Sequence, residues 1–181
     1  MASGQSIWEI DPAHSAAQFS VRHMMVSTVR GTFEKMSGSV LWDGNDFTTA
    51  SVEVAIETAS ITTREPKRDA HLKSADFFDA EKYPTLTFMS TAIEAAGPGK
   101  AKMTGDLTLR GATRRVMFDV EGPTPAIKDP YGYIRVGATA TTRINRQDFG
   151  VSWNALLDAG GVVVGDDVTI TIDIEIMRKA D

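Results

Sequence analysis

The clearest pattern in the chain is a strict alternation of apolar and polar residues over 168–176. Every second position there carries a branched aliphatic residue: Val168, Ile170, Ile172, Ile174 and Ile176. A period of two places these side chains on one face of an extended strand, so it predicts a half-buried antiparallel strand. Because the same alternation recurs along most of the chain, we expect an all-β fold that closes into a barrel or stacks as a sandwich to bury its apolar face.

Alternation of the same kind marks the remaining strands. It predicts strands over 17–23, 29–42, 52–56, 86–90, 103–109, 116–120 and 134–144. Within 29–42 the apolar positions shift by one residue, which predicts a β-bulge or bend near Lys35. A total of about eight strands favours an antiparallel up-and-down barrel.

Two stretches interrupt this pattern. Residues 64–83 are rich in charge and lack the alternation, and Pro66 suits the first turn of a helix, so they predict a short helical insertion. Residues 145–165 are also irregular, and a helical turn is predicted over 153–157. The rest of the chain reads as strands joined by tight turns.

The predicted strand 134–144 carries small residues on its apolar face. Ala138, Ala140 and Thr142 stand where a packed β core more often carries Val, Ile or Phe. Small inward-facing residues leave room, and an eight-stranded barrel is just wide enough to hold one small ligand. Large neighbours such as Phe88 and Phe118 could equally fill that space, so the periodicity leaves both a cavity and a filled core open.

Composition limits the classes of function. The chain of 181 residues has the length of one domain, which we place at 7–177 after a disordered tail at 1–6. A net charge of −5 argues against a nucleic-acid partner, and the lack of cysteine excludes disulfides and thiolate chemistry. No apolar run approaches the roughly 18 residues of a membrane span. No signal peptide is visible, so we expect a cytoplasmic protein, or a periplasmic one if a signal has been removed.

A search for catalytic and metal-binding motifs finds little. The sequence has no Gly-x-Ser-x-Gly, no phosphate-binding loop and no dinucleotide fingerprint. The three histidines, His14, His23 and His71, are not in metal-ligand spacing with one another. Asp11 with His14, or Asp69 with His71, could orient an imidazole, but such pairs near a turn are usually local hydrogen bonds. We therefore predict no catalytic residue, no metal and no cofactor.

Three further groups of residues have two interpretations each. Alternation places His23 on the face of Phe19 and Val21, either as a buried histidine bonded to a backbone carbonyl or as a polar contact at a cavity mouth. Phe77 and Phe78 either cap the barrel end or form a ligand portal, and both can hold together. The last group follows the strand 134–144 and favours a bracing network over headgroup binding: Arg143, Asn145, Arg146 and Asp148.

Several ordered motifs together resemble one family. The stretch 69–79, Asp-Ala-His-Leu-Lys-Ser-Ala-Asp-Phe-Phe-Asp, followed by Tyr-Pro-Thr-Leu-Thr-Phe at 83–88, closely resembles the YceI-like, polyisoprenoid-binding family. Further segments agree in the right order: 11–15 with 19–23, 105–113, 144–150 and 164–168. The resemblance covers about residues 7 to 177, which is nearly the whole chain.

This resemblance implies a lipocalin-like antiparallel barrel whose apolar pore holds a long-chain isoprenoid or other apolar lipid. It also implies no catalysed reaction, a homodimer, and a bacterial isoprenoid carrier or store. By alternation and position, we expect the pore to be lined by Phe19, Val21, His23, Phe33, Phe88, Leu107, Phe118, Ala138, Ala140 and Thr142. We expect Phe77, Phe149 and Trp153 at its mouth.

Two alternatives to a lipid-binding protein stay open. The first is an enzyme that acts on a lipid or small apolar substrate, with His23 or His71 as the acid/base group. No nucleophile, base and orienting group occur together in the sequence, which makes this the lesser reading. The second is a stress-related scaffold whose cavity is incidental.

Overall fold

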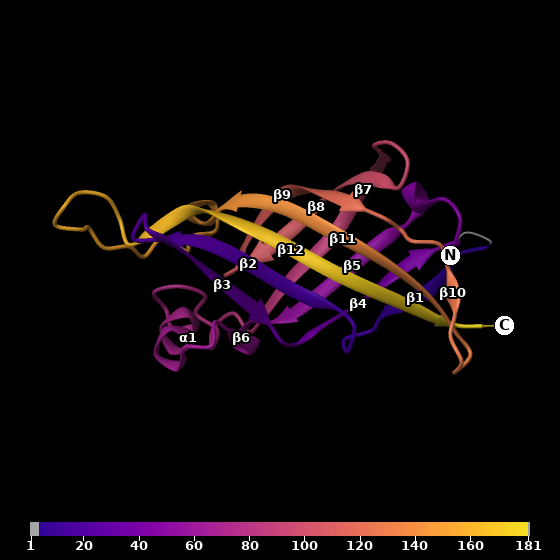
Figure 1. Cartoon of the computed structure of the whole chain (residues 1–181), viewed down its shortest axis with the longest axis horizontal. Coiled ribbons are helices and arrows are strands. Elements are labelled where there is room, and N and C mark those ends of the chain that lie inside the picture. The colour runs from indigo at the N-terminus through magenta and orange to yellow at the C-terminus, as the bar shows by residue number, and fades with distance from the viewer. Residues whose placement is uncertain (1–3, 181) are drawn as a thin grey trace.

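The fold is a closed antiparallel barrel of eight strands with one short helix outside it (Figure 1). The computed structural model describes residues 4–180. The predicted tail 1–6 lies partly outside the described residues, and within them Ser6 already opens the first strand. No helix among residues 4–180 is long and apolar enough to cross a membrane.

Each strand is bounded as follows. The N-terminal half contains β1 (Ser6–Ile10), β2 (Ala16–His23), β3 (Ser27–Phe33), β4 (Met36–Trp42), β5 (Ser51–Glu57) and β6 (Ile61–Thr62). The C-terminal half contains β7 (Thr85–Ala95), β8 (Lys100–Leu109), β9 (Ala112–Glu121), β10 (Ile127–Lys128), β11 (Tyr133–Asn145) and β12 (Val164–Lys179). The helix α1 is Pro66–Lys73, and the short 3-10 helices are Phe47–Thr49, Thr58–Ser60 and Arg146–Phe149.

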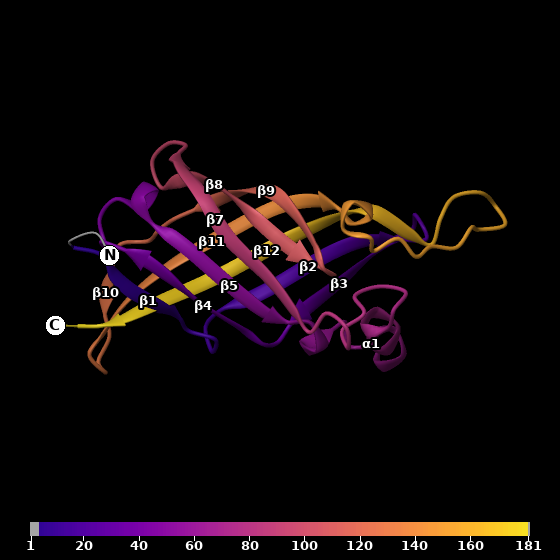
Figure 2. The same ribbon diagram turned by 180° about the vertical axis from the view of Figure 1, so that it is seen from behind.

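The barrel wall runs in the order β11, β9, β8, β7, β5, β4, β1, β12 and closes where β12 pairs with β11. β12 is long enough to pair with two strands on its other side. Its C-terminal part pairs with β1, and its N-terminal part pairs with β2, which continues to β3 and β6. The wall therefore has β1 and β4 at one end and β2 and β3 at the other, as Figures 1 and 2 both show.

The alternation located most strands correctly, and the exceptions have physical causes. The predicted break near Lys35 is confirmed, since β3 ends at Phe33, β4 begins at Met36, and the Lys35 amide donates to Ser60 Oγ at 3.1 Å. The predicted helical insertion contains α1, whose N-terminus is capped by the Glu65 carboxylate. The strand β1 escaped prediction because it is short.

The helical turn predicted over 153–157 is wrong. This stretch belongs to an irregular loop, 154–163, which contains one isolated bridge between Leu156 and Val162. The amide side chain of Asn154 holds the base of the loop, because it donates to the Val164 carbonyl at 2.8 Å and accepts from the Val164 amide at 3.0 Å. An amide that bonds the backbone in this way favours a loop over a helix.

The end of the barrel formed by β1 and β4 is filled by large aromatic side chains. Trp8 and Trp42 are almost fully buried, with ring centroids 5.3 Å apart, and Phe47 meets Trp42 edge-on at 5.9 Å. Val136 and Ile176 belong to the same buried cluster. These residues form a plug that closes this end, so an interior space can open only toward β2, β3 and α1.

Candidate ligand cavity and its mouth

A cavity of about 500 Å³ occupies the barrel between the plug and the opposite end. Its wall is built from the inward-facing side chains of β2, β5, β7, β8 and β12, and its opening lies at α1 and the loop before β12. The wall is almost wholly aliphatic and aromatic. The sequence left a cavity and a filled core equally open, and the structure decides for a cavity.

Most of the residues expected to line the pore do line this cavity. The residues on its wall are Phe19, Val21, His23, Phe33, Phe88, Leu107, Phe118 and Ala140. Phe88 and Phe118 meet edge-on at 5.2 Å, and they form part of the wall without filling the interior. Gly105 makes this packing possible, because a Cβ on Gly105 would lie 2.4 Å from the Phe88 ring.

Two of the expected lining residues, Ala138 and Thr142, are not among the residues that line this cavity. Ala138 packs against the buried barrel core and lines a separate hollow near His14 and Glu175. The Thr142 hydroxyl donates to the Met117 carbonyl at 2.7 Å, where the ladder between β9 and β11 has ended after Thr141. That bond holds the Thr142 side chain between β9 and β11 and away from the cavity.

Several lining residues were not expected from the sequence. The inner face of β12 contributes Val168, Ile170, Ile172 and Ile174. Their alternation was the strongest pattern in the chain, so it contained the signal for their placement. The half-buried positions Val54 and Ile56 on β5 line the cavity as well. The unexpected polar residues at the opening come from α1 and the end of β2, where no period-2 pattern marks them.

The mouth is framed by an aromatic cluster. His71 lies edge-on to Phe77, with ring centroids 5.0 Å apart, and edge-on to Trp153 at 4.8 Å. Phe77 and Trp153 line the cavity, as expected of mouth residues. Phe149 does not line the cavity, because it is buried in a cluster with Phe77 and Val151. Phe78 closes the opposite rim against Phe33 at 5.7 Å.

The histidine pairing predicted for this region also needs correction. His71 Nε2 bonds Asp76 Oδ2 at 2.7 Å, whereas Asp69 accepts from the Thr63 amide at 2.8 Å and so anchors α1 to the barrel. His23 lines the cavity near its opening. Among residues 4–180 no hydrogen bond or ion pair is found for the His23 ring, which favours the mouth interpretation over a satisfied core histidine.

Three cationic side chains line the opening: Arg22, Lys67 and Arg68. Arg22 donates to Thr28 and to the Met25 carbonyl, and Arg68 donates to Thr63, so both bond neutral groups. Glu65 lies beside them, but its carboxylate accepts from the backbone amides of Lys67 and Arg68. No ion pair joins these cations to a carboxylate within the described residues.

Arg146 braces the loop that shapes the mouth. It is only 4% exposed, and it donates to the carbonyls of Val151 at 2.6 Å, Gly165 at 2.9 Å and Trp153 at 2.9 Å. Burial lowers the pKa of its guanidinium, and the nearby Asp166 carboxylate opposes that shift. The structure thus favours bracing over headgroup binding. Arg143, by contrast, is exposed and pairs with Asp167 at 2.5 Å on the outer surface.

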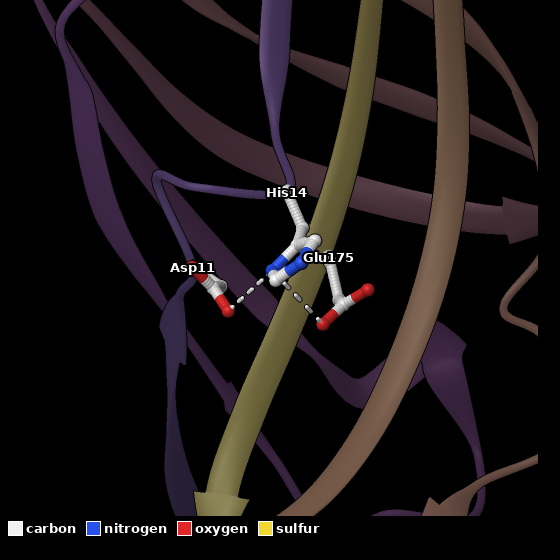
Figure 3. Close-up of side chains that lie close together, drawn as sticks. All are labelled: Asp11, His14 and Glu175. Atoms are coloured by element: carbon white, nitrogen blue, oxygen red, sulfur yellow. Dashed lines mark hydrogen bonds and ion pairs between the residues drawn. The ribbon is translucent and has the colours of Figure 1, made fainter.

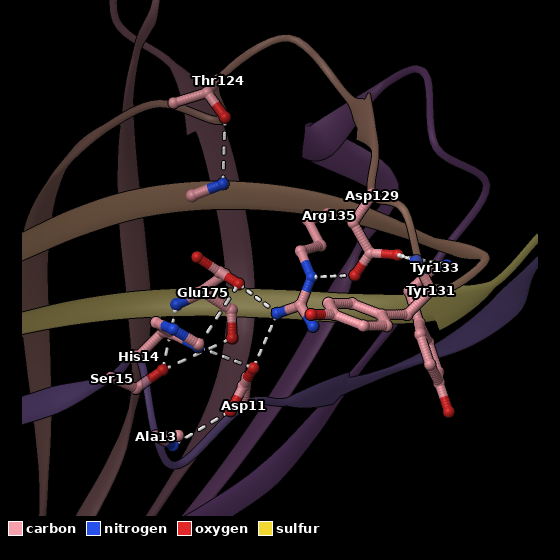
Figure 4. Close-up of polar contacts among 11 residues, drawn as sticks. Asp11, Ala13, His14, Ser15, Thr124, Asp129, Tyr131, Tyr133, Arg135 and Glu175 are labelled. Carbon is pink, nitrogen blue, oxygen red and sulfur yellow. Dashed lines mark hydrogen bonds and ion pairs between the residues drawn. The ribbon is translucent and has the colours of Figure 1, made fainter.

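A second polar cluster lies outside the barrel, at the end opposite the mouth. His14 Nδ1 bonds Asp11 Oδ2 at 2.9 Å, as the sequence suggested, and lies 3.9 Å from Glu175 (Figure 3). Figure 4 shows the Arg135 guanidinium between Asp129 on one side and Asp11 with Glu175 on the other. Hydrogen bonds from Arg135 and then His14 lower the pKa of Asp11 to about 2.

The same cluster is the one group of residues among 4–180 with the spacing of a metal site. Ligand atoms of Asp11, His14 and Glu175 lie within 4.8 Å of one another. However, Arg135 already donates to both carboxylates, and the pKa of Arg135 is raised by Asp129 first and then by Asp11. A guanidinium therefore supplies the positive charge here, so a divalent cation would have to displace it.

Comparison with known proteins agrees with this architecture. A family model described as YceI-like domain matches residues 8–176. A UPF0312 protein of Staphylococcus aureus strain MSSA476 is 36% identical over 165 residues, covering 91% of this chain and 94% of the relative. The UPF0312 protein of strain USA300 matches with the same identity and coverage.

Solved structures match the fold along nearly the whole chain. The crystal structure of Burkholderia cenocepacia BcnA superposes with a TM-score of 0.77 at 26% identity, covering 92% of this chain and 98% of BcnA. The Campylobacter jejuni YceI protein gives 0.74 at 30% identity, covering 87% and 90%. A polyisoprenoid binding domain from Saccharophagus degradans shares the fold, with a TM-score of 0.66 at 13% identity over 96% and 98% of the two chains. The barrel, its strand order and these matches together show that the chain belongs to the YceI-like family.

Proposed function

We propose that this protein binds one long apolar lipid, a polyisoprenoid or a similar chain, inside the barrel for carriage or storage. The observation that carries the proposal is the cavity of about 500 Å³, walled by aliphatic and aromatic side chains and open at one end. Its volume lies within the range of small-molecule sites, roughly 300–1,000 Å³. The Saccharophagus degradans domain of the same fold, named for polyisoprenoid binding, supports this class of ligand.

Hydration supplies the driving force for such binding. Each methylene group removed from water contributes roughly 0.8 kcal/mol, so a chain of several isoprene units gains more than its own ordering costs. An apolar wall discriminates weakly between chains that differ by one methylene. Selectivity between lipids then depends on the length of the cavity and on the polar groups at its mouth.

The distribution of polar groups favours one orientation of the ligand. The inner wall of the cavity is almost wholly aliphatic and aromatic, whereas His23, Arg22 and Arg68 lie at the opening. A buried polar headgroup without partners would be costly, so the apolar chain enters first and any headgroup stays at the mouth. We propose the wall residues, among them Phe88 and Ala140, as the ligand contacts.

We further propose that the protein binds without catalysing a reaction. Of the two histidines in the cavity, His71 is oriented by Asp76, but within the described residues neither imidazole is hydrogen-bonded to a hydroxyl that could act as a nucleophile. Acid/base catalysis usually needs a base that is oriented by a second group and placed against a nucleophile or a water. An enzyme would be favoured instead if the wild type turned over an added lipid and the His23→Ala variant still bound that lipid but no longer turned it over.

Native mass spectrometry followed by solvent extraction tests the binding proposal. We expect the purified protein to carry one apolar lipid, and we expect protein stripped by unfolding and refolding to rebind an added polyprenyl lipid. An empty barrel that also fails to bind added polyprenyl, fatty-acyl and quinone lipids would refute the proposal. In that case the cavity would be incidental, as in the scaffold alternative.

A further inference from the structure

Large apolar side chains are exposed at the open end of the barrel. Met24, Met25 and Val26 form the turn between β2 and β3 and are 43%, 66% and 80% exposed. Leu156, in the loop 154–163, is 86% exposed. We call these four residues the apolar tip. Figures 1 and 2 both show this loop projecting beyond the barrel wall, next to the end of β2 and β3.

The two parts of the apolar tip are held together. The Met24 amide donates to the Val163 carbonyl at 2.7 Å, which joins the β2–β3 turn to the loop. Contact is close enough that a Cβ on Gly161 would lie 2.4 Å from Met25 Sδ. The tip is therefore one surface, and it borders the cavity, because His23 and Val163 on either side of this junction both line the opening.

The backbone of the turn is unfavourable for the residues that occupy it. Met24 and Met25 have φ angles of 50° and 59°, and the Val26 amide donates to the His23 carbonyl at 3.0 Å, so they are the two central residues of a β-turn and both lie in the left-handed region. Asn-Gly is the preferred pair for such a turn. Neither side chain belongs to the barrel core, since Met24 and Met25 are largely exposed and the contact that Met25 makes is with Gly161 of the neighbouring loop. Strain of this kind at an exposed position indicates a functional role for the side chains.

Positive charge surrounds the same end. Arg22, Lys67 and Arg68 line the opening without a carboxylate partner among the described residues, while Glu65 is occupied by the amides of α1. The acidic groups at this end are Asp158, in the loop itself, and Asp76, which is half exposed and bonds His71 at the mouth. The whole chain carries a charge of −5, so an anionic surface repels the molecule in general and attracts it through this end.

We propose that the open end docks on an anionic lipid bilayer. The apolar tip enters the boundary between headgroups and acyl chains, and Arg22, Lys67 and Arg68 lie among the lipid phosphates. Exposed apolar residues flanked by cations are the footprint of interfacial membrane binding. A convex tip of two protruding loops also suits a deformable bilayer better than a protein groove. This inference goes beyond the proposed cargo, because it assigns the surface at which a lipid would enter or leave.

Vesicle flotation tests the docking surface directly. We expect the wild-type protein to float with vesicles of equal parts phosphatidylcholine and phosphatidylglycerol and to float less with phosphatidylcholine alone. The double variant Met24→Asn/Met25→Gly should lower binding by roughly tenfold or more, since it removes both inserted side chains. The triple variant Arg22→Gln/Lys67→Gln/Arg68→Gln should lower it by about fivefold for each cation lost at low salt.

The design separates docking from folding. Met24→Asn/Met25→Gly places the preferred residues in the left-handed turn, so its thermal midpoint should equal or exceed that of the wild type while its vesicle binding falls. The matched control is Met89→Ser/Met117→Ser, which removes two exposed methionines from the barrel wall and should leave vesicle binding unchanged.

Three results would overturn the inference. The first is that the wild-type protein floats with neither kind of vesicle. The second is that the Met24→Asn/Met25→Gly variant floats as well as the wild type. The third is that light scattering finds the wild type to be a dimer and this variant to be a monomer. The last would show that a second copy of the chain covers the tip. Lipid content, measured by native mass spectrometry on the same samples, keeps the two proposals apart. A protein that floats but carries no lipid rejects only the cargo, and a loaded protein that does not float rejects only the docking.

Discussion

Filling the cavity from its wall is the sharpest test of the binding site. Ala140 lies on β11 with its small side chain facing the cavity, and its neighbour Thr141 is exposed on the outer face. In Ala140→Trp an indole occupies space that the ligand otherwise uses. If it displaces four or five methylene groups, at roughly 0.8 kcal/mol each, binding weakens by about 3–4 kcal/mol, or two to three orders of magnitude in Kd.

Competition with a fluorescent fatty-acyl or polyprenyl probe measures this loss. The series Ala140→Leu, Ala140→Phe and Ala140→Trp should weaken binding progressively, while Thr141→Trp on the outer face should leave it unchanged. Circular dichroism and the thermal midpoint check that each variant is folded. Probe affinity in a folded Ala140→Trp protein equal to that of the wild type would show that the ligand does not occupy this part of the barrel.

Further predictions concern stability. Arg146→Met leaves several buried carbonyls without a donor and should cost about 3–5 kcal/mol, whereas Arg143→Met breaks an exposed ion pair and should cost less than about 1 kcal/mol, both measured by urea unfolding. The lowered pKa of Asp11, about 2 against an ordinary 3.8, stabilises the fold above pH 4, so the stability gap between wild type and Asp11→Asn should close as pH falls toward 2. Gly105→Ala should destabilise by about 1–3 kcal/mol, while Gly137→Ala, whose Cβ would meet its nearest neighbour at an ordinary van der Waals distance of 3.7 Å, should be tolerated.

Each of these has a result that contradicts it. Equal urea midpoints for Arg146→Met and Arg143→Met would show that the buried guanidinium does not brace the mouth loop. A stability gap for Asp11→Asn that is constant from neutral pH to pH 2 would mean that the carboxylate titrates alike in the folded and unfolded chain. An unchanged midpoint for Gly105→Ala would mean that the Phe88 ring moves freely away from that position.

The sequence predicted the strands well because their signal is local. A strand shows its two faces in the residues themselves, and β12 displays this over its full inner face. β1 escaped because it offers only Trp8 and Ile10 as buried positions, too few to establish a period. The loop at 153–157 was misassigned because a short run of Trp, Ala and Leu fits a helix equally well. Its conformation depends on Asn154 bonding Val164, ten residues further along the chain.

The site itself was only partly within reach of the sequence. Alternation distinguishes inward-facing from outward-facing residues. It does not show where along the barrel axis the packed interior ends and the open cavity begins. Ala138 and Ala140 share one face of β11, yet only Ala140 lines the cavity, while Ala138 lies beside a second hollow near His14 and Glu175. The Thr142 side chain likewise has a partner that its own strand does not reveal, because the Met117 carbonyl that it bonds lies on another strand. The cations at the mouth come from distant parts of the chain, since Arg22 lies on β2 whereas Lys67 and Arg68 lie on α1, so only the folded structure brings them together.

The plug of Trp8 and Trp42 has a kinetic consequence. A barrel that is sealed at one end must load and unload through the same opening, so an incoming lipid cannot push a bound one out from behind. Exchange then follows a ping-pong scheme in which one cargo leaves fully before the next begins to enter. Transfer between two lipid pools would run only down the difference in their chemical potentials, and its rate would saturate at the time needed for one chain to withdraw.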